Sequence, residues 1–256
     1  MDWKMSIDLT WNDAKTVATV MLNRPETLNA MTADALDEVG HAFQQADAEG
    51  ARIILLRGAG RSFCAGADRK QYPGFKTSEE NIGRTQNAIE VGVQLKRGLM
   101  GTNALTIAQV HGHAVGGGLV MAMCCDMRFA ADDARMSLPE LKLALPLGWG
   151  ALYRLIELVG TTRAWSLLAE FEELSGTQAV EAGLFSAAFA PDQLGQQVQQ
   201  RIDALLQIDP EALFLTKRQF RAIAARASFG NIEELDGALL LGPLRGPHVR
   251  EKFAGL

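Results

Sequence analysis

The chain has 256 residues, of which 48% are hydrophobic, and a formal net charge of −5. This size suits one domain with an appendage or two small domains, and the acidic balance gives no electrostatic footprint for nucleic acid. The N-terminus lacks the apolar segment of a signal peptide, no apolar stretch is long enough to span a bilayer, and three cysteines are an odd number for a disulfide framework. We therefore expect a cytoplasmic protein with neither a nucleic-acid nor a membrane partner.

The N-terminal part predicts strands followed by a helix. Residues 6–10 and 16–22 have the alternating or continuous apolar pattern of two paired strands. Thr32 is a candidate N-cap for a helix from about residue 33 to 48. The continuous apolar run at residues 53–56 is typical of a buried parallel strand.

The middle of the chain continues this alternation. A long helix is predicted from about residue 79 to 100, and a strand at 106–110. A triple glycine then opens an apolar helix at 119–124, and residues 127–131 predict a further strand. Strands separated by helices indicate a parallel α/β core.

No strand pattern remains after about Asp192, and the rest of the chain predicts helices. We therefore expect an α/β core over residues 1–191, which carries the binding site, and a helical C-terminal segment over residues 192–256. The predicted helices of this segment are at 196–206, 211–227 and 232–241.

Two glycine-bearing stretches, 60–68 and 111–118, each follow an apolar run, and Glu140 comes shortly after the second. Glycine lets the backbone adopt positive φ and lets a ligand approach closely. Two such turns in one pocket can direct two backbone N–H groups at one developing oxyanion. A glutamate beside them can move a proton.

Four segments in this order resemble the enoyl-CoA hydratase/isomerase (crotonase) superfamily, and the match covers essentially the whole chain. They are Arg24–Met31 (RPETLNAM), Phe63–Asp68 (FCAGAD), His111–Gly118 (HGHAVGGG) with Cys125-Asp126 after it, and Pro139-Glu140. The resemblance implies a spiral of β-β-α turns with a helical C-terminal segment that forms trimers or dimers of trimers. It also implies an acyl-CoA substrate, with CoA present only as part of that substrate and no separate cofactor.

The resemblance assigns the oxyanion hole to the backbone N–H groups of Ala67 and Gly117. Gly117 lies at a predicted helix start, where free N–H groups and the helix dipole favour negative charge. Glu140 matches the catalytic glutamate of the family. Its neighbours are mostly apolar, and partial burial would raise the pKa of its carboxyl toward neutrality. The alternatives are ordinary tight turns and a solvated surface glutamate.

Val120 departs from the pattern of family hydratases, which carry a second glutamate two residues after the GGG run. Valine can neither donate nor accept a proton, so hydration by two carboxyls is not expected. One carboxyl beside an oxyanion hole can still transfer a proton from the α-carbon to the γ-carbon. The active-site pattern is closest to single-glutamate members such as Δ3,Δ2-enoyl-CoA isomerases.

Other reactions on the same fold stay open. Single-glutamate relatives include decarboxylases and other lyases, and a further alternative is a hydrolase or hydratase in which another residue, such as His113, supplies the second acid or base. A non-catalytic binding protein is disfavoured because Glu140 and both glycine turns are present. RNA binding is disfavoured because residues 32–43, at the start of the first predicted helix, include no lysine or arginine.

The H-x-H pair His111 and His113 is expected to lie on one face of a strand, but no third ligand has an obvious spacing, so no metal is expected. Substrate contacts are also implied by the resemblance. The predicted substrate-binding residues are Thr27, Leu28, Ala30, Ala65, Gly66, Asp68, Arg69, His113, Gly116, Val120, Pro139 and Trp149.

Overall fold

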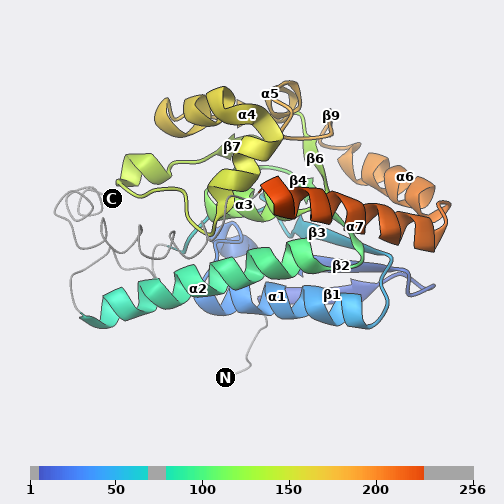
Figure 1. Cartoon of the computed structure of the whole chain (residues 1–256). Helices are drawn as coiled ribbons and strands as arrows, with labels where there is room; N and C mark the ends of the chain where they lie inside the picture. Colours follow the sequence, from blue (N-terminus) through green and yellow to red (C-terminus); the bar gives the residue numbers. More distant parts are fainter. Residues whose placement is uncertain (1–5, 69–78, 228–256) are drawn as a thin grey trace.

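The computed structural model describes residues 6–68 and 79–227. The largest element is a six-stranded sheet in the order β1-β2-β3-β4-β6-β9 (Figure 1). β1 pairs antiparallel with β2, and every other neighbouring pair in this sheet is parallel. The predicted strand pair and the parallel α/β core are therefore confirmed. The strands are β1 (Ile7–Trp11), β2 (Val17–Leu22), β3 (Ile53–Gly58), β4 (Leu105–Val110), β6 (Met127–Ala131) and β9 (Ala187–Phe189).

A second sheet has three very short strands in the order β5-β7-β8, with bounds His113–Val115, Arg135–Ser137 and Leu174–Ser175. None of these strands is predicted from the sequence, because two or three residues are too few to show a period of two. β5 lies within the second glycine stretch, and β7 ends three residues before Glu140. Their parallel pairing, Val115 opposite Ser137, therefore brings these two segments together.

The helices surround the sheets, and α1 and α2 lie side by side along one side of the main sheet (Figure 1). α3 lies in the middle, in contact with α2, α4 and β4. The predicted helices at 33–48, 79–100, 119–124, 196–206 and 211–227 are confirmed, while that at 232–241 lies outside the described residues. The helices are α1 (Ala33–Ala48), α2 (Glu79–Gly101), α3 (Gly117–Cys124), α4 (Ala151–Ala169), α5 (Gly176–Glu181), α6 (Leu194–Leu206) and α7 (Pro210–Ala227), with short 3₁₀ helices η1 (Pro25–Thr27) and η2 (Glu140–Leu143).

Local sequence signals explain why individual elements begin where they do. Thr32 caps α1, since its side-chain oxygen accepts a hydrogen bond from the Ala35 N–H at 3.0 Å. Ser175 begins α5 with a capping box completed by Gln178. The apolar run of β3 is buried on both faces between two parallel neighbours, as predicted.

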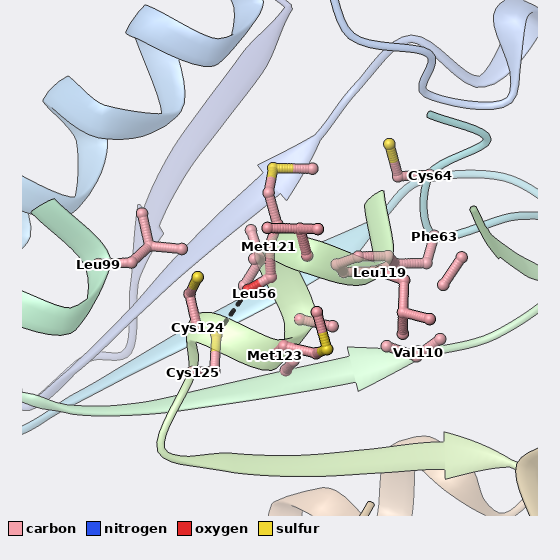
Figure 2. Packing of buried hydrophobic residues seen from close by; sticks show 14 of the residues in the cluster. Leu56, Phe63, Cys64, Leu99, Val110, Leu119, Met121, Met123, Cys124 and Cys125 are labelled. Carbon is pink, nitrogen blue, oxygen red and sulfur yellow. Dashed lines mark hydrogen bonds between the residues drawn. The ribbon is translucent and has the colours of Figure 1, made fainter. Parts of the chain in front are cut away.

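The core is centred on α3, which is apolar on all sides and buried along nearly its whole length. Figure 2 shows α3 residues Leu119, Met121 and Met123 packed among side chains of the strands and α2. All three cysteines are free and buried. Burial raises the pKa of the Cys64 thiol to about 12, so this side chain packs as a small apolar group and is no nucleophile near neutral pH.

The two described C-terminal helices pack on the same body. α6 contacts β4, β6 and β9, and α7 contacts β4. Lys217 of α7 is buried, and its Nζ lies 2.8 Å from Asp126 Oδ2 and donates to Thr102 Oγ1 at 3.1 Å. The division of the chain at residues 191 and 192 stays a prediction. Among the described helices, none is apolar enough over a sufficient length to cross a membrane.

Candidate active site

The first glycine stretch lies along the second. The Cys64 N–H donates to the His113 carbonyl at 2.9 Å, and the Val115 N–H donates to the Cys64 carbonyl at 3.0 Å. Gly66 follows with φ 90°, and a Cβ atom there would lie 2.8 Å from the Val115 carbonyl oxygen. A side chain is therefore excluded at residue 66 both by conformation and by space.

Ala67 is exposed and presents its N–H away from its neighbouring segment. Met31 forms a parallel bridge with Ala67, in which the Met31 N–H donates to the Gly66 carbonyl and the Asp68 N–H donates to the Met31 carbonyl. A bridge of this kind uses the groups on either side of Ala67 and leaves its own N–H pointing outward. Within the described part of the chain, this N–H has no hydrogen-bond partner.

Gly117 is the first residue of α3. Gly116 precedes it with φ 52° and is fixed by two hydrogen bonds, from its N–H to the Ser137 carbonyl at 2.9 Å and from the Val120 N–H to its own carbonyl at 3.0 Å. The Gly117 N–H meets no acceptor among the residues the structure describes. A free N–H at a helix start carries partial positive charge and favours an anion.

Glu140 extends from the first turn of η2 toward this helix start. Its Oε1 lies 2.9 Å from the point where a Cβ atom on Gly116 would be. Its Oε2 is buried and, among the described residues, has no hydrogen-bond partner. Burial raises the pKa of the carboxyl from 4.5 to about 7, against a smaller lowering effect of its own backbone N–H. Glu140 is therefore not a solvated surface glutamate.

Among the described residues, no charged side chain contributes to this rise in the pKa of Glu140. Two other acidic residues in the motifs form ion pairs elsewhere, Asp68 with Arg24 and Asp126 with Lys217. Val120 is buried in α3, one helical turn from the Gly116–Gly117 turn. The described site thus holds a single carboxyl that is poised to exchange a proton near neutral pH.

The residues predicted from the RPETLNAM segment lie against the first glycine stretch. The Ala65 N–H donates to the Leu28 carbonyl at 3.0 Å. Asn29 is buried, and its Nδ2 donates to the Ala59 carbonyl at 2.9 Å and the Ser62 carbonyl at 2.7 Å. Leu28 and Asn29 both have φ 56°, so the chain turns sharply after η1, which ends at Thr27.

Arg24 completes this junction. Its Nη1 donates to the Ala30 carbonyl at 2.6 Å, and its Nη2 forms an ion pair with Asp68 Oδ2 at 2.9 Å. The structure therefore brings together the predicted residues Leu28, Ala30, Ala65 and Asp68. Arg69 lies outside the described residues.

The two histidines do not share one strand face, which corrects the expectation for the H-x-H pair. Gly112, between them, has φ 59°, so the chain turns there before β5 begins. His111 Nε2 lies 2.8 Å from the Gly60 carbonyl oxygen, and His113 Nδ1 lies 3.1 Å from Ser62 Oγ. His113 is exposed. Across the described ranges, no three His, Cys, Asp or Glu side chains group as a metal site.

Trp149 lies against the start of α3. Its Cη2 would be 2.7 Å from a Cβ atom on Gly117, and its Cε2 and Nε1 would be 2.1 Å from a Cβ atom on Gly92 of α2. Lys96, one turn farther along α2, donates from Nζ to the Gly150 carbonyl at 3.1 Å. Gly92 and Lys96 are absent from the predicted residues, since a glycine and a lysine inside a helix give no local signal of a distant contact.

Comparison with known proteins identifies the family to which the chain belongs. The family model described as enoyl-CoA hydratase/isomerase matches residues 12–236. A probable enoyl-CoA hydratase of Bacillus subtilis (strain 168) is 37% identical over 171 residues, which cover 66% of this chain and 64% of that relative. The chain thus spans less than two thirds of that relative's length. Other relatives are also named hydratases.

One relative is named for a different reaction, and a solved structure has the same fold. The peroxisomal Delta(3,5)-Delta(2,4)-dienoyl-CoA isomerase of Arabidopsis thaliana is 31% identical over 186 residues, which cover 70% of this chain and 67% of that relative. The crystal structure of enoyl-CoA hydratase from Bacillus halodurans aligns with a TM-score of 0.90 at 20% identity, over 98% of this chain and 100% of that one. The chain therefore belongs to the enoyl-CoA hydratase/isomerase family and has the crotonase fold.

Proposed function

We propose that this protein acts on acyl-CoA thioesters through an enolate, and that it isomerises 3-enoyl-CoA to 2-enoyl-CoA. The observation that carries the proposal is the carboxyl of Glu140, which burial gives a pKa of about 7 and which lies beside the Gly116–Gly117 turn. A group that is partly ionised near neutral pH can both remove and return a proton.

The proposed reaction has two proton transfers. The thioester oxygen accepts hydrogen bonds from the Ala67 and Gly117 N–H groups, both of which are unpaired in the described chain. Glu140 removes a proton from the α-carbon, and the electron pair of that C–H bond delocalises into the carbonyl as an enolate. The protonated Glu140 then returns the proton to the γ-carbon, the double bond moves to the 2-position, and Glu140 is again ionised.

Hydration is the second candidate, because several relatives are named hydratases. Adding water needs a base for the water and a proton donor for the neighbouring carbon. Val120 cannot supply either, and the exposed His113 has its Nδ1 next to Ser62. These observations favour isomerisation. A decarboxylase or another lyase with one carboxyl uses the same enolate and stays an alternative within this proposal.

A substrate panel separates these reactions. The purified protein is incubated with a 3-enoyl-CoA, a 2-enoyl-CoA and a malonyl-type thioester, and Glu140→Gln serves as the matched variant. We expect the wild type to turn over the 3-enoyl-CoA and Glu140→Gln to lose this activity. Turnover of the malonyl-type thioester alone would establish the lyase alternative. Binding of all three without turnover would establish a non-catalytic binding protein.

We also propose that the protein assembles as a trimer or a dimer of trimers. α7 leaves large apolar side chains exposed, with Phe220 at 72% and Ile223 at 68% of their full exposure. Apolar side chains at spacing i and i+3 lie on one helix face, and covering them against another subunit removes that area from water.

A further inference from the structure

The indole of Trp149 bridges two helices at the candidate active site. One end of the ring meets Gly92 of α2 and the other meets Gly117 of α3, and a Cβ atom on either glycine would overlap the ring, at 2.1 Å and 2.7 Å. A real Cβ atom essentially never comes this close to another heavy atom. Both glycines are therefore needed for the indole to occupy this place.

The backbone around the indole is held in an unfavourable conformation. Trp149 and Gly150 have φ 62° and 63°, and a bulky residue is rare in this left-handed region. Such conformations persist where surrounding contacts fix them and are common at functional sites. One such contact is the hydrogen bond from Lys96 Nζ to the Gly150 carbonyl, which is buried because Lys96 is 7% exposed.

Gly92 and Lys96 are four residues apart and so lie on the same face of α2. On that face, Gly92 leaves room for the indole. One turn farther along, Lys96 donates a hydrogen bond to Gly150, the residue after Trp149. One helix therefore contacts the indole at Gly92 and holds the backbone just after Trp149 through Lys96.

The position of the indole relates directly to the proposed reaction. Glu140 lies against Gly116, and the indole lies against Gly117, the adjacent residue. We expect an acyl group whose carbonyl is bound by the Gly117 N–H to extend from this turn between the carboxyl and the ring. A longer chain must continue past the indole.

We infer that Trp149 is a specificity-determining residue that restricts the enzyme to short-chain acyl-CoA thioesters, and that Lys96 is a positioning residue for it. This inference rests on the proposed function, since it names the class of acyl group that the same site accepts. Removing the indole opens space between Gly92 and Gly117, which additional methylene groups can occupy.

The test compares acyl-chain length in binding and in turnover. Saturated acyl-CoAs from butyryl to decanoyl, which cannot isomerise, are titrated by calorimetry against the wild type, Trp149→Ala and Trp149→Phe. The matching 3-enoyl-CoAs are assayed for isomerisation. Trp165→Ala is the matched control, because Trp165 lies on α4 and is 62% exposed.

The wild type is expected to prefer the short chains. Trp149→Ala should raise the kcat/KM ratio of decenoyl over butenoyl substrate by about tenfold or more, the usual effect of space for added methylenes in an apolar site. Trp149→Phe should give an intermediate ratio and keeps the inference testable if the alanine variant fails to fold. Trp165→Ala should leave the ratio unchanged.

Two further variants test the residues of α2 that hold the indole in place. Gly92→Ala should alter the chain-length ratio in the wild type but have little effect in the Trp149→Ala background, because the clash needs both side chains. Lys96→Met should move the ratio in the same direction as Trp149→Ala. A general loss of stability would lower all rates without changing this ratio.

The outcomes separate this inference from the proposed function. If the wild type accepts decenoyl as well as butenoyl substrate, or if Trp149→Ala and Trp149→Phe leave the ratio unchanged, the inference is wrong while acyl-CoA chemistry stands. If no acyl-CoA of any length binds the wild type, the proposed function is wrong and this inference with it.

Discussion

The Oε1 atom of Glu140 lies 2.9 Å from the position that a Cβ atom on Gly116 would take, so the carboxyl rests directly on the backbone of the second glycine turn. Residue 116 also has φ 52°, which disfavours any side chain. This contact places the Glu140 carboxyl next to Gly117, whose N–H is the proposed oxyanion donor.

Gly116→Ala should displace the carboxyl and lower kcat about a hundredfold, as expected when a catalytic group is misplaced by an ångström or so. The matched control is Gly195→Ala in α6, where no atom lies within 4 Å of the added Cβ atom and φ is not positive. Isomerisation rates and circular dichroism spectra of both variants give the answer. A folded Gly116→Ala enzyme with the wild-type rate would contradict the placement of Glu140.

Glu140→Gln keeps the shape of the side chain and removes its proton chemistry. The expected loss of kcat is about a hundred- to ten-thousandfold, the range for a positioned acid–base group. Binding of a saturated acyl-CoA should persist, because the backbone donors are unchanged. Glu173→Gln, at a half-exposed residue (52%), is the control. Wild-type turnover by Glu140→Gln would refute its assignment as the base.

The pKa of Glu140 predicts the direction of two pH effects. The base must be ionised, so kcat/KM for isomerisation should rise with pH through about 7 and then level off. The folded pKa is raised, so the protonated carboxyl contributes stability that is fully present below its ordinary value of 4.5 and is lost as pH rises through about 7.

Thermal unfolding of Glu140→Gln beside the wild type isolates this stability term, because glutamine does not titrate. The wild type should lose stability relative to the variant as pH rises from below 4.5 to above 7. A difference in Tm that stays constant across this range would mean that burial does not raise the pKa.

Assembly is tested at the exposed apolar face of α7. The wild type should scatter light as a trimer or hexamer at micromolar concentration. Phe220→Ser with Ile223→Ser should shift the mass toward the monomer, because the apolar area that we propose is covered between subunits is lost. Gln219→Ser, at an exposed polar residue of the same helix, is the control. A monomeric wild type would rule the assembly out.

Much of the fold could be predicted where a strand or helix is long enough to show its period, although α4 and β9 were not predicted. Ile53–Leu56 is one example, since four consecutive apolar residues within β3 are buried between parallel neighbours. The strands of the second sheet were not predicted, because residues 113–115 or 135–137 carry no periodic signal. They are specified by pairing between distant segments.

At the candidate site, too, features with a local sequence pattern could be predicted, while contacts between distant residues could not. Glu140 and the glycine turns could be found from local sequence, and burial then raises the pKa of the Glu140 carboxyl as expected. The contact of Trp149 with Gly92 could not be found, because it joins two residues with no shared local pattern. The interpretation of the H-x-H pair was wrong because the positive φ of Gly112 turns the chain between the histidines.

The most direct test of the account compares two reactions of the wild type. With Val120 in place of a second carboxyl, isomerisation of a 3-enoyl-CoA in D2O should give the 2-enoyl product with some deuterium incorporated, because the Glu140 carboxyl exchanges with solvent between the two transfers. Hydration of crotonyl-CoA under the same conditions should be slow or absent. If the wild type hydrates crotonyl-CoA as efficiently as it isomerises the 3-enoyl-CoA, the single-carboxyl account is wrong and another group must supply the second acid or base.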